Sequence, residues 1–168
     1  MPPATEEFRE AIVELLPRLR RLARALAGHV HEADDLVQIT IERALSRAEQ
    51  WRPDSPLPSW MFGILRNAWI DEGRVRRRRA RVLVAEELGE NVADPRADTY
   101  AQALSVQAAV SQLSDEQREV IGLVLVEGLS YKEAAQVMGV PIGTLTSRLA
   151  RAREALQGLL SAEEGVHP

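Results

Sequence analysis

The sequence contains no cysteine and few aromatic residues, and both absences narrow what the protein can be. Without cysteine, neither a disulfide framework nor a cysteine-ligated zinc site can form. Aromatic residues make up only 4% of the 168 residues, and runs of β-branched residues are short. A chain rich in Ala, Leu, Arg and Glu instead favours an all-α fold.

The sequence also lacks the segments and motifs that mark membrane proteins and enzymes. No apolar run approaches the roughly 18 residues that a membrane span needs, and no signal peptide opens the chain. There is no phosphate-binding loop, no G-x-S-x-G motif and no H-E-x-x-H motif. The histidines at positions 29, 31 and 167 do not have zinc-ligand spacing. We therefore expect a cytoplasmic protein that is not an enzyme, inserts into no membrane and needs no cofactor, metal ion or small-molecule ligand.

Residues 129–156, LSYKEAAQVMGVPIGTLTSRLARAREAL, have the pattern of a helix-turn-helix. Ser130 and Glu133 form a capping box at the start of the first helix. Gly139 permits a sharp turn, and Pro141 favours the start of a second helix. One face of that second helix is an apolar stripe, made of Leu145, Leu149, Ala152 and Leu156.

The opposite face of the second helix is small, hydroxyl-bearing and cationic. It carries Gly143, Ser147, Ala150 and Arg151, with Thr144 and Thr146 on its flanks. Such a face suits insertion into a DNA major groove. An ordinary helical hairpin with a polar outer face is the alternative interpretation of this window.

Three further helices are predicted in the first half of the chain, over residues 6–27, 33–48 and 59–80. Pro17 is expected to break or kink the first, which Gly28 ends. A short turn over residues 29–33 precedes the second helix, which Asp34 or a neighbour caps. The loop of residues 51–60, WRPDSPLPSW, contains three prolines and cannot be a helix interior.

Two features of this first half have both a structural and a functional interpretation. The third helix ends in an arginine cluster: Arg74, Arg76, Arg77, Arg78, Arg79 and Arg81. Cations suit a helix C-terminus, but six arginines exceed that need and favour contacts with nucleic-acid phosphates. Trp51 and Trp60 are typical core residues, yet the loop between them could also capture unstacked bases.

The chain divides into two small helical domains joined by a flexible acidic linker. The first domain covers residues 1–85 and the linker covers residues 86–107, with helix resuming near Thr99. The second domain covers residues 108–160 and a tail covers residues 161–168. Ser114 and Gln117 form another capping box near the start of the second domain.

These motifs, taken in order, resemble the group IV, or extracytoplasmic function (ECF), sigma factors of bacterial RNA polymerase. The matching segments are ADDLVQITIERAL (33–45), PLPSWMFGILRNAWIDEGRVRRRR (56–79) and LSDEQREVIGLVLVEGLSYKEAAQVMGVPIGTLTSRLARAREAL (113–156). Within the family, the resemblance is to general-stress-response members of alphaproteobacteria. It implies an alternative sigma factor that directs promoter-specific initiation. Residues 1–85 would be region 2, which melts the −10 element, and residues 108–160 would be region 4, which reads the −35 element.

The resemblance also implies roles for individual residues. Core RNA polymerase would bind through its β′ clamp helices to Asp34, Asp35, Leu36, Val37 and Gln38, and through its β flap. The −10 element would contact Trp51, Asp54, Ser55, Asn67, Arg74, Arg76, Arg77 and Arg78. The −35 element would contact Pro141, Gly143, Thr144, Thr146, Ser147, Arg148 and Arg151. Promoter DNA and an anti-sigma factor are therefore expected partners beside the polymerase.

Some positions depart from the family pattern. Ile39 stands where many members have an acidic residue, and Thr146 where many have Lys or Arg. Arg148 lies near the apolar stripe, so it would brace the fold or reach a phosphate rather than a base. These departures leave a sigma-like decoy, which binds an anti-sigma factor but no promoter, as one alternative. A stand-alone helix-turn-helix regulator is the other, and it would be a dimer on a palindromic site.

Overall fold

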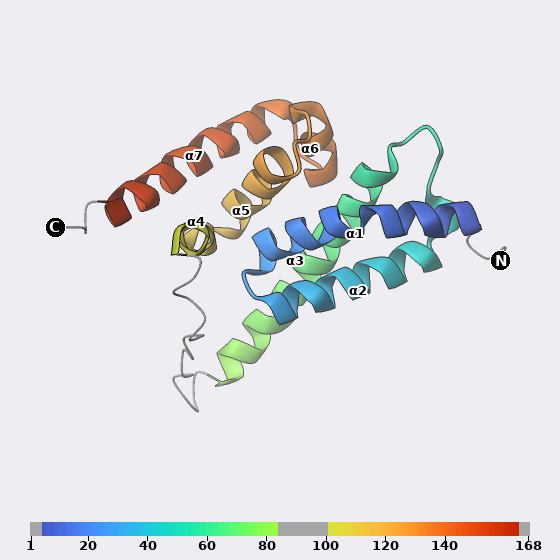
Figure 1. Ribbon diagram of the computed structural model, residues 1–168, viewed down its shortest axis with the longest axis horizontal. Coiled ribbons are helices and arrows are strands. Elements are labelled where there is room, and N and C mark those ends of the chain that lie inside the picture. Colours follow the sequence, from blue (N-terminus) through green and yellow to red (C-terminus); the bar gives the residue numbers. More distant parts are fainter. Residues whose placement is uncertain (1–4, 84–100, 165–168) are drawn as a thin grey trace.

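A computed structural model describes residues 5–83 and 101–164, and all regular structure within these ranges is helical (Figure 1). The first unit consists of α1 (Glu6–Ala27), α2 (Val30–Ser46), the short 3-10 helix η1 (Ala48–Gln50) and α3 (Leu57–Leu83). The second unit consists of α4 (Ala101–Gln112), α5 (Asp115–Ile121), the π-helical turn η3 (Gly122–Val126), α6 (Tyr131–Met138) and α7 (Ile142–Glu164). The sequence thus predicts the fold class and the two-part organisation correctly.

The first unit is built on the apolar stripe of α1. Leu19 and Leu22 of α1 are fully buried, as are Phe62 and Leu65 of α3. The break that the sequence predicts at Pro17 does not occur, because α1 runs unbroken from Glu6 to Ala27. Pro17 is exposed, and the stripe continues on both sides of it, so packing outweighs one missing backbone hydrogen bond. Gly28 ends the helix as predicted, in the left-handed conformation with φ of 76°.

The next two helices begin earlier than their sequence signals indicate. α2 begins at Val30, with His29 at the N-cap and no side-chain hydrogen bond there, so the prediction of Asp34 as a cap is wrong. The Ala33 N–H already donates to the His29 carbonyl at 2.9 Å, which places Asp34 a full turn inside the helix. α3 begins at Leu57 rather than Ser59 because Pro58 suits a helix's first turn.

The second unit contains the predicted helix-turn-helix, with both capping boxes confirmed. Ser130 accepts from the Glu133 N–H at 3.1 Å and the Glu133 carboxylate accepts from the Ser130 N–H at the same distance. Ser114 and Gln117 make the equivalent pair at the start of α5. Gly139 turns the chain between α6 and α7 with φ of 67°. α4 begins inside the predicted linker, whose residues 86–100 lie outside the described part of the chain.

The two units pack against one another rather than standing apart. α5 and η3 lie along α1, α4 packs on α7 and also touches α1, and α6 lies on α3 (Figure 1). Buried residues of both units form one continuous apolar cluster. At Gly122 the approach is so close that an added Cβ would lie 2.8 Å from a methyl of Leu22. This interface determines which of the predicted site residues face each other.

Candidate functional site

A pocket of about 340 Å3 joins two of the residues predicted to contact the −10 element. Ser55 comes from the proline-rich loop and Asn67 from the exposed face of α3, and both line this pocket. The wall opposite α3 is supplied by the second unit, through Gln136 and Val137 of α6. Trp51 and Asp54 do not line the pocket, and Asp54 is exposed on the loop.

Two half-buried tryptophans support the loop beside this pocket. The indole N–H of Trp51 donates to the Ser55 carbonyl at 3.0 Å, and its ring centroid lies 5.8 Å from that of Phe8. Trp60 packs on the same phenylalanine at 6.1 Å while another part of it lines the pocket. Trp51 therefore fixes the shape of the loop, and Trp60 belongs to both core and pocket.

Sequence reasoning did not assign the lining residues Ser59, Trp60 and Gly63 to the pocket. Their spacing from Asn67 does carry a signal, because residues three or four apart share one face of a helix. The part of the pocket that α6 supplies has no comparable signal in the sequence, since it depends on how the two units pack.

The segment predicted to bind polymerase is divided between two faces of α2. Asp34, Val37 and Gln38 line a groove of about 520 Å3 between α1 and α2. Its apolar floor includes Leu16 and Ile41 and its rim is charged, with Arg20 and Arg24 on the α1 side and Glu42 on the α2 side. Asp35 and Leu36 instead line a small pocket beside Trp69, and Leu36 is 3% exposed. Leu36 thus packs the helix, whereas Asp34, Asp35 and Gln38 are exposed to solvent.

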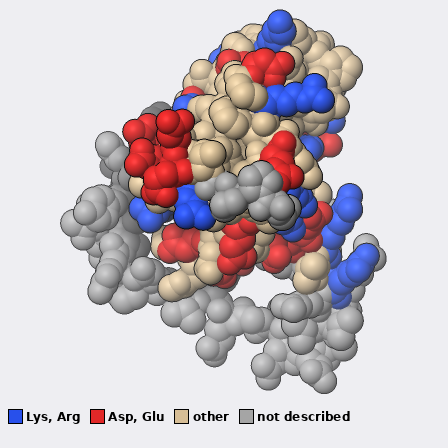
Figure 2. Space-filling view, turned by 90° about the vertical axis from the view of Figure 1, so that its right-hand side faces the viewer, with Lys and Arg blue, Asp and Glu red and all other residues tan. Residues whose placement is uncertain are grey.

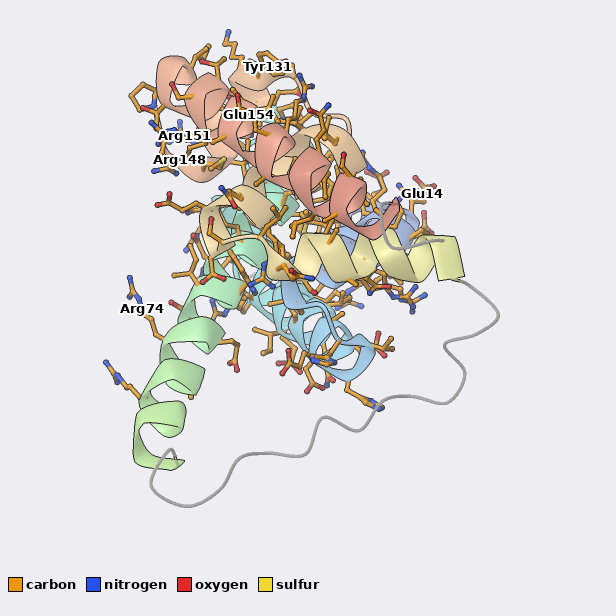
Figure 3. The ribbon with its side chains drawn as sticks, turned by 90° about the vertical axis from the view of Figure 1, so that its left-hand side faces the viewer. Glu14, Arg74, Tyr131, Arg148, Arg151 and Glu154 are labelled. Carbon is orange, nitrogen blue, oxygen red and sulfur yellow. The ribbon has the colours of Figure 1, made fainter. Side chains whose placement is uncertain are left out.

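The arginine cluster lies in the C-terminal part of α3. Arg74 and Arg78 are exposed, and the side chains of Arg76 and Arg77 lie outside the described part of the structure. Arg74 points to the same side of the molecule as Arg148 and Arg151 of α7 (Figure 3). A cleft of about 500 Å3 lies between α3 and the second unit, and both Arg74 and Arg148 line it.

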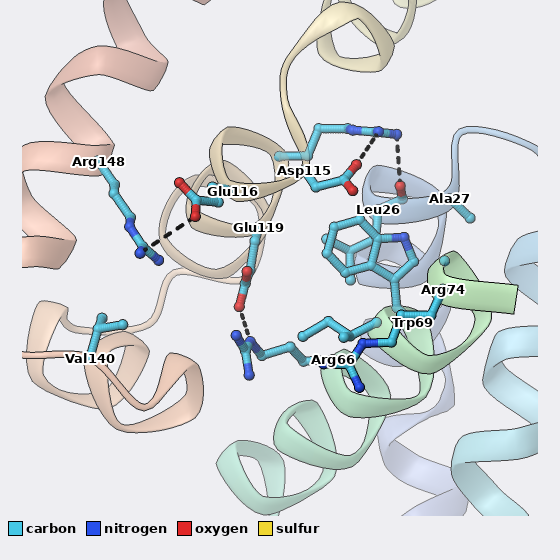
Figure 4. Close-up of a pocket in the computed structure, with 13 residues that line it drawn as sticks. Leu26, Ala27, Arg66, Trp69, Arg74, Asp115, Glu116, Glu119, Val140 and Arg148 are labelled. Carbon is cyan, nitrogen blue, oxygen red and sulfur yellow. Dashed lines mark hydrogen bonds and ion pairs between the residues drawn. The ribbon is translucent and has the colours of Figure 1, made fainter. Parts of the chain in front are cut away.

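This cleft contains paired charges (Figure 4). Glu119 of α5 is buried and accepts a hydrogen bond from Nε of Arg66, so this pair links the two units. Burial raises the pKa of the Glu119 carboxyl above its ordinary value of 4.5, while the hydrogen bond and positive charge of Arg66 oppose that rise. Arg118 donates to Asp115 at 2.8 Å and to the Leu26 carbonyl of α1 at 3.0 Å.

The predicted −35 face lies at the start of α7 and is largely open to solvent. Pro141, Gly143, Ser147 and Arg151 are exposed, and Thr144 and Thr146 are half-buried. The Thr146 hydroxyl donates to the Gly143 carbonyl at 2.9 Å, which turns it toward its own helix. Arg148 is different because its guanidinium lies 3.6 Å from the Glu116 carboxylate of α5. That pairing supports the bracing role considered for Arg148 from the sequence.

Charges of both signs alternate over the face of the molecule in Figure 2. Acidic groups lie beside basic ones there, so the described residues on this face form no continuous basic surface. Within residues 5–83 and 101–164, no helix is both long enough and apolar enough to cross a bilayer.

Comparison with known proteins finds relatives of both units. The profile of "Sigma-70, region 4" matches residues 103–156, and that of "Sigma2 domain of PhyR" matches residues 12–66. The chain is 37% identical over 158 residues to the ECF RNA polymerase sigma factor EcfG of Rhodopseudomonas palustris, covering 94% of this chain and 87% of that protein.

Two solved structures are similar over nearly the whole chain. One is the sigma factor RpoE of Bartonella quintana in complex with the anti-sigma factor NepR, with a TM-score of 0.82 and 33% identity over 94% of this chain and 98% of that one. The other is CnrH in complex with the cytosolic domain of CnrY, with a TM-score of 0.70 and 26% identity over 92% and 88% of the two chains. The similarity therefore includes the arrangement of both helical units.

Proposed function

The chain belongs to the ECF sigma factors of bacterial RNA polymerase, and we propose that its two helical units divide promoter recognition between them. As an alternative sigma factor, it binds core polymerase and directs transcription from specific promoters. We assign residues 1–85 to region 2, residues 86–107 to the linker and residues 108–160 to region 4. The observation that carries the assignment of roles is the pocket that joins Ser55 and Asn67.

Region 2 opens the −10 element by capturing a base that has left the stack. Unstacking a base costs a few kcal/mol, and a pocket that binds the splayed base offsets that cost. Ser55 and Asn67 supply a hydroxyl and an amide at the pocket, which suit the hydrogen-bonding edge of a base. The exposed Arg74 and Arg78 on the same helix would hold the DNA backbone through phosphate contacts.

The groove between α1 and α2 is the site we propose for the β′ clamp helices of polymerase. An apolar floor between a basic rim and an acidic rim suits a charged amphipathic helix. Asp34 and Gln38 would then make direct contacts, and Leu36 would act by packing α2 in place. The basic rim of Arg20 and Arg24 was not predicted from the sequence.

Region 4 reads the −35 element with the exposed start of α7. Arg151 projects from this face, and Gly143 and Ser147 leave room for the helix to enter the major groove. Neither alternative from the sequence is favoured, because the family match covers both units in order. A stand-alone regulator would not explain the first unit, and a decoy would not need an exposed reading face.

We further assign the chain to the general-stress-response group, with an anti-sigma factor as its natural partner in the cytoplasm. The likeness to EcfG and to the NepR-bound RpoE supports this assignment. Purified NepR-like proteins from the same genome should bind the chain and reduce its transcription with core polymerase.

The roles of the groove and the pocket can be tested separately. Gln38→Ala with Asp34→Ala should weaken binding to core polymerase about tenfold or more, because both side chains are exposed in the groove. Asn67→Ala should leave that affinity unchanged and reduce promoter opening, which permanganate reactivity of unpaired thymines reports. Equal loss of polymerase binding in both variants would contradict this division of roles.

A further inference from the structure

Ile142 is a large apolar side chain that is exposed at the first turn of α7. It is 49% exposed, whereas Leu145 and Leu149 of the same helix are buried in the core. One exposed apolar residue is ordinary on a protein surface, so its exposure alone indicates no site. Its position is informative, because the second helix of a helix-turn-helix contacts base edges through its N-terminal residues and helical side chains lean toward the N-terminus. Ile142 therefore projects from the end of α7 that would enter the major groove.

Thr146 and Ala150 continue an apolar edge from Ile142 along α7. Residues four apart are neighbours on one side of a helix, so Ile142, Thr146 and Ala150 form a line. The Thr146 hydroxyl donates to the Gly143 carbonyl at 2.9 Å. Thr146 therefore has no free O–H to donate to a base, and its methyl group is the part left for an apolar contact. Ala150 is exposed and also ends in a methyl group, so we call these three residues the methyl edge of α7.

The methyl edge lies beside the polar part of the reading face. Ser147 and Arg151 each follow one residue of the edge in the sequence, about 100° further round the helix, and both are exposed. Gly143 follows Ile142, and nothing lies within 4 Å of a Cβ built there, so a base edge has room to approach. The start of α7 thus presents an apolar edge and a hydrogen-bonding, cationic edge side by side.

The apolar group that a base pair presents in the DNA major groove is the 5-methyl group of thymine. The other groups there are hydrogen-bond donors and acceptors, to which the side chains of Ile142 and Ala150 offer no partner. Position 146 fits the same chemistry, because threonine stands there in place of the Lys or Arg of many family members. A cation contacts the DNA backbone without reading its sequence, whereas a methyl contact depends on the base.

We propose that Ile142, with Thr146 and Ala150 beside it, reads the thymine methyl groups of A·T pairs in the −35 element. The proposal rests on the proposed role of region 4 in −35 recognition, and it adds the class of base pair that one side of α7 selects. Ser147 and Arg151 contact polar base edges or phosphates, while the methyl edge removes thymine methyl groups from water. The −35 element of this chain therefore contains A·T pairs, and an element made only of G·C pairs would contradict the proposal.

Uracil in place of thymine tests the contact, because deoxyuridine lacks only the 5-methyl group and pairs with adenine in the same way. The probe is a labelled promoter fragment that the holoenzyme transcribes, made once with thymine and once with uracil throughout the −35 element. Fluorescence anisotropy measures the Kd of the holoenzyme for each fragment, and the ratio of the two Kd values is the readout. A variant that only weakens DNA binding in general changes both Kd values equally and leaves the ratio as it was.

The natural chain should bind the thymine fragment about three- to fourfold more tightly for each methyl group contacted, the factor that burial of one methylene-sized group contributes. Ile142→Ser should lower this ratio toward 1. Thr146→Ser removes a methyl group but keeps the hydroxyl that donates to Gly143, so it should lower the ratio by less. Thr146→Val keeps a methyl group at that place and should preserve the ratio. Val106→Ser on α4 is the matched control, because Val106 is 47% exposed outside the reading face, and it should leave the ratio unchanged.

Equal affinities of the natural chain for the two fragments would overturn the role of the methyl edge. A ratio that Ile142→Ser leaves unchanged, with helix content retained in circular dichroism, would overturn it as well. If Ile142→Ser does not fold, Thr146→Ser decides: a lower ratio supports the proposal, and an unchanged ratio overturns it.

Failure of the methyl edge and failure of the proposed function give different results. If Arg151→Ala weakens promoter binding while the thymine and uracil fragments bind equally, the role of region 4 at the −35 element stands and the methyl edge fails. If neither Arg151→Ala nor uracil changes promoter binding, the proposed role of region 4 fails together with the methyl edge.

Discussion

Arg148 and Arg151 lie on neighbouring parts of α7, yet the structure gives them different surroundings. Arg148 is ion-paired with Glu116 of α5, whereas Arg151 is exposed on the face that carries Ser147. Sequence periodicity distinguished the two, because Arg148 falls near the apolar stripe and Arg151 opposite it. The pairing partner of Arg148 was not predictable, since Glu116 belongs to another helix.

Replacing Arg151 by alanine should weaken promoter binding by the polymerase holoenzyme by about 1–3 kcal/mol, the contribution of one good contact between a side chain and a base pair. Arg153→Ala is the matched control, because it removes the same charge from an exposed position facing away from Ser147. Fluorescence anisotropy with a labelled promoter measures the affinity of the holoenzyme that contains each variant. An equal loss for the two variants would show that α7 contributes charge and no base recognition.

Glu119 should make the stability of the protein depend on pH in a direction opposite to that of most carboxylates. Burial raises its pKa above 4.5, so between that value and the raised pKa the folded chain carries a proton that the unfolded chain does not. The stability that Glu119 contributes is therefore present at low pH and lost as the pH rises through the folded pKa.

Urea unfolding of the natural chain and of Glu119→Gln between about pH 5 and pH 8 isolates this effect. The free energy of unfolding of the natural chain, minus that of the variant, should decrease as the pH rises. A difference that grows with pH would mean that the ion pair with Arg66 outweighs the burial of the carboxyl group.

At the scale of whole helices, the sequence predicted a helix end correctly where residues next to it in the chain determine that end. Both capping boxes appear as predicted, and Gly28 and Gly139 end their helices where the sequence indicated, both with a left-handed backbone. Pro17 did not break α1, because buried leucines on both sides keep the helix on one core. The π-helical turn η3 was not predicted either, since LVLV reads locally as part of an ordinary helix.

Gly122 in this π-helical turn should resist substitution although its backbone is helical. An alanine there would gain helix propensity but would bring Cβ to 2.8 Å from the buried Leu22. We expect Gly122→Ala to lower the free energy of unfolding by about 1–2 kcal/mol through overpacking. Gly158→Ala on α7, where nothing lies within 4 Å, should raise it by about 0.5–1 kcal/mol.

Thermal unfolding followed by circular dichroism distinguishes the two glycine variants. A melting temperature that rises for Gly122→Ala as it does for Gly158→Ala would show that η3 can move away from α1 at little cost. The close contact between the units would then be incidental to stability.

At the scale of the whole molecule, the sequence predicted two helical units but not their mutual placement. The contact between Arg18 and Glu127 joins positions 109 residues apart, and nothing in either segment indicates the other. The sequence likewise assigned the residues of each site to a single unit, with none contributed by the other. The pocket that joins Ser55 and Asn67 could therefore be predicted on its α3 side, through Asn67, and not on its α6 side.

The charge of the whole chain should make it a weak DNA binder on its own. The formal net charge is −4, and acidic and basic side chains alternate on the face shown in Figure 2. We expect the isolated chain to bind promoter DNA no more tightly than about 10⁻⁶ M at physiological salt, which is the range of non-specific binding. Anisotropy titrations with and without core polymerase test this, and nanomolar binding by the chain alone would contradict it.

Run-off transcription with purified core polymerase and promoter fragments from the source genome tests the central claim most directly. If the two units read the −10 and −35 elements as proposed, the chain will produce specific transcripts that disappear with Asn67→Ala and with Arg151→Ala. Binding to core polymerase without any transcript, after removal of co-purifying inhibitors, would contradict promoter-directed initiation by this chain.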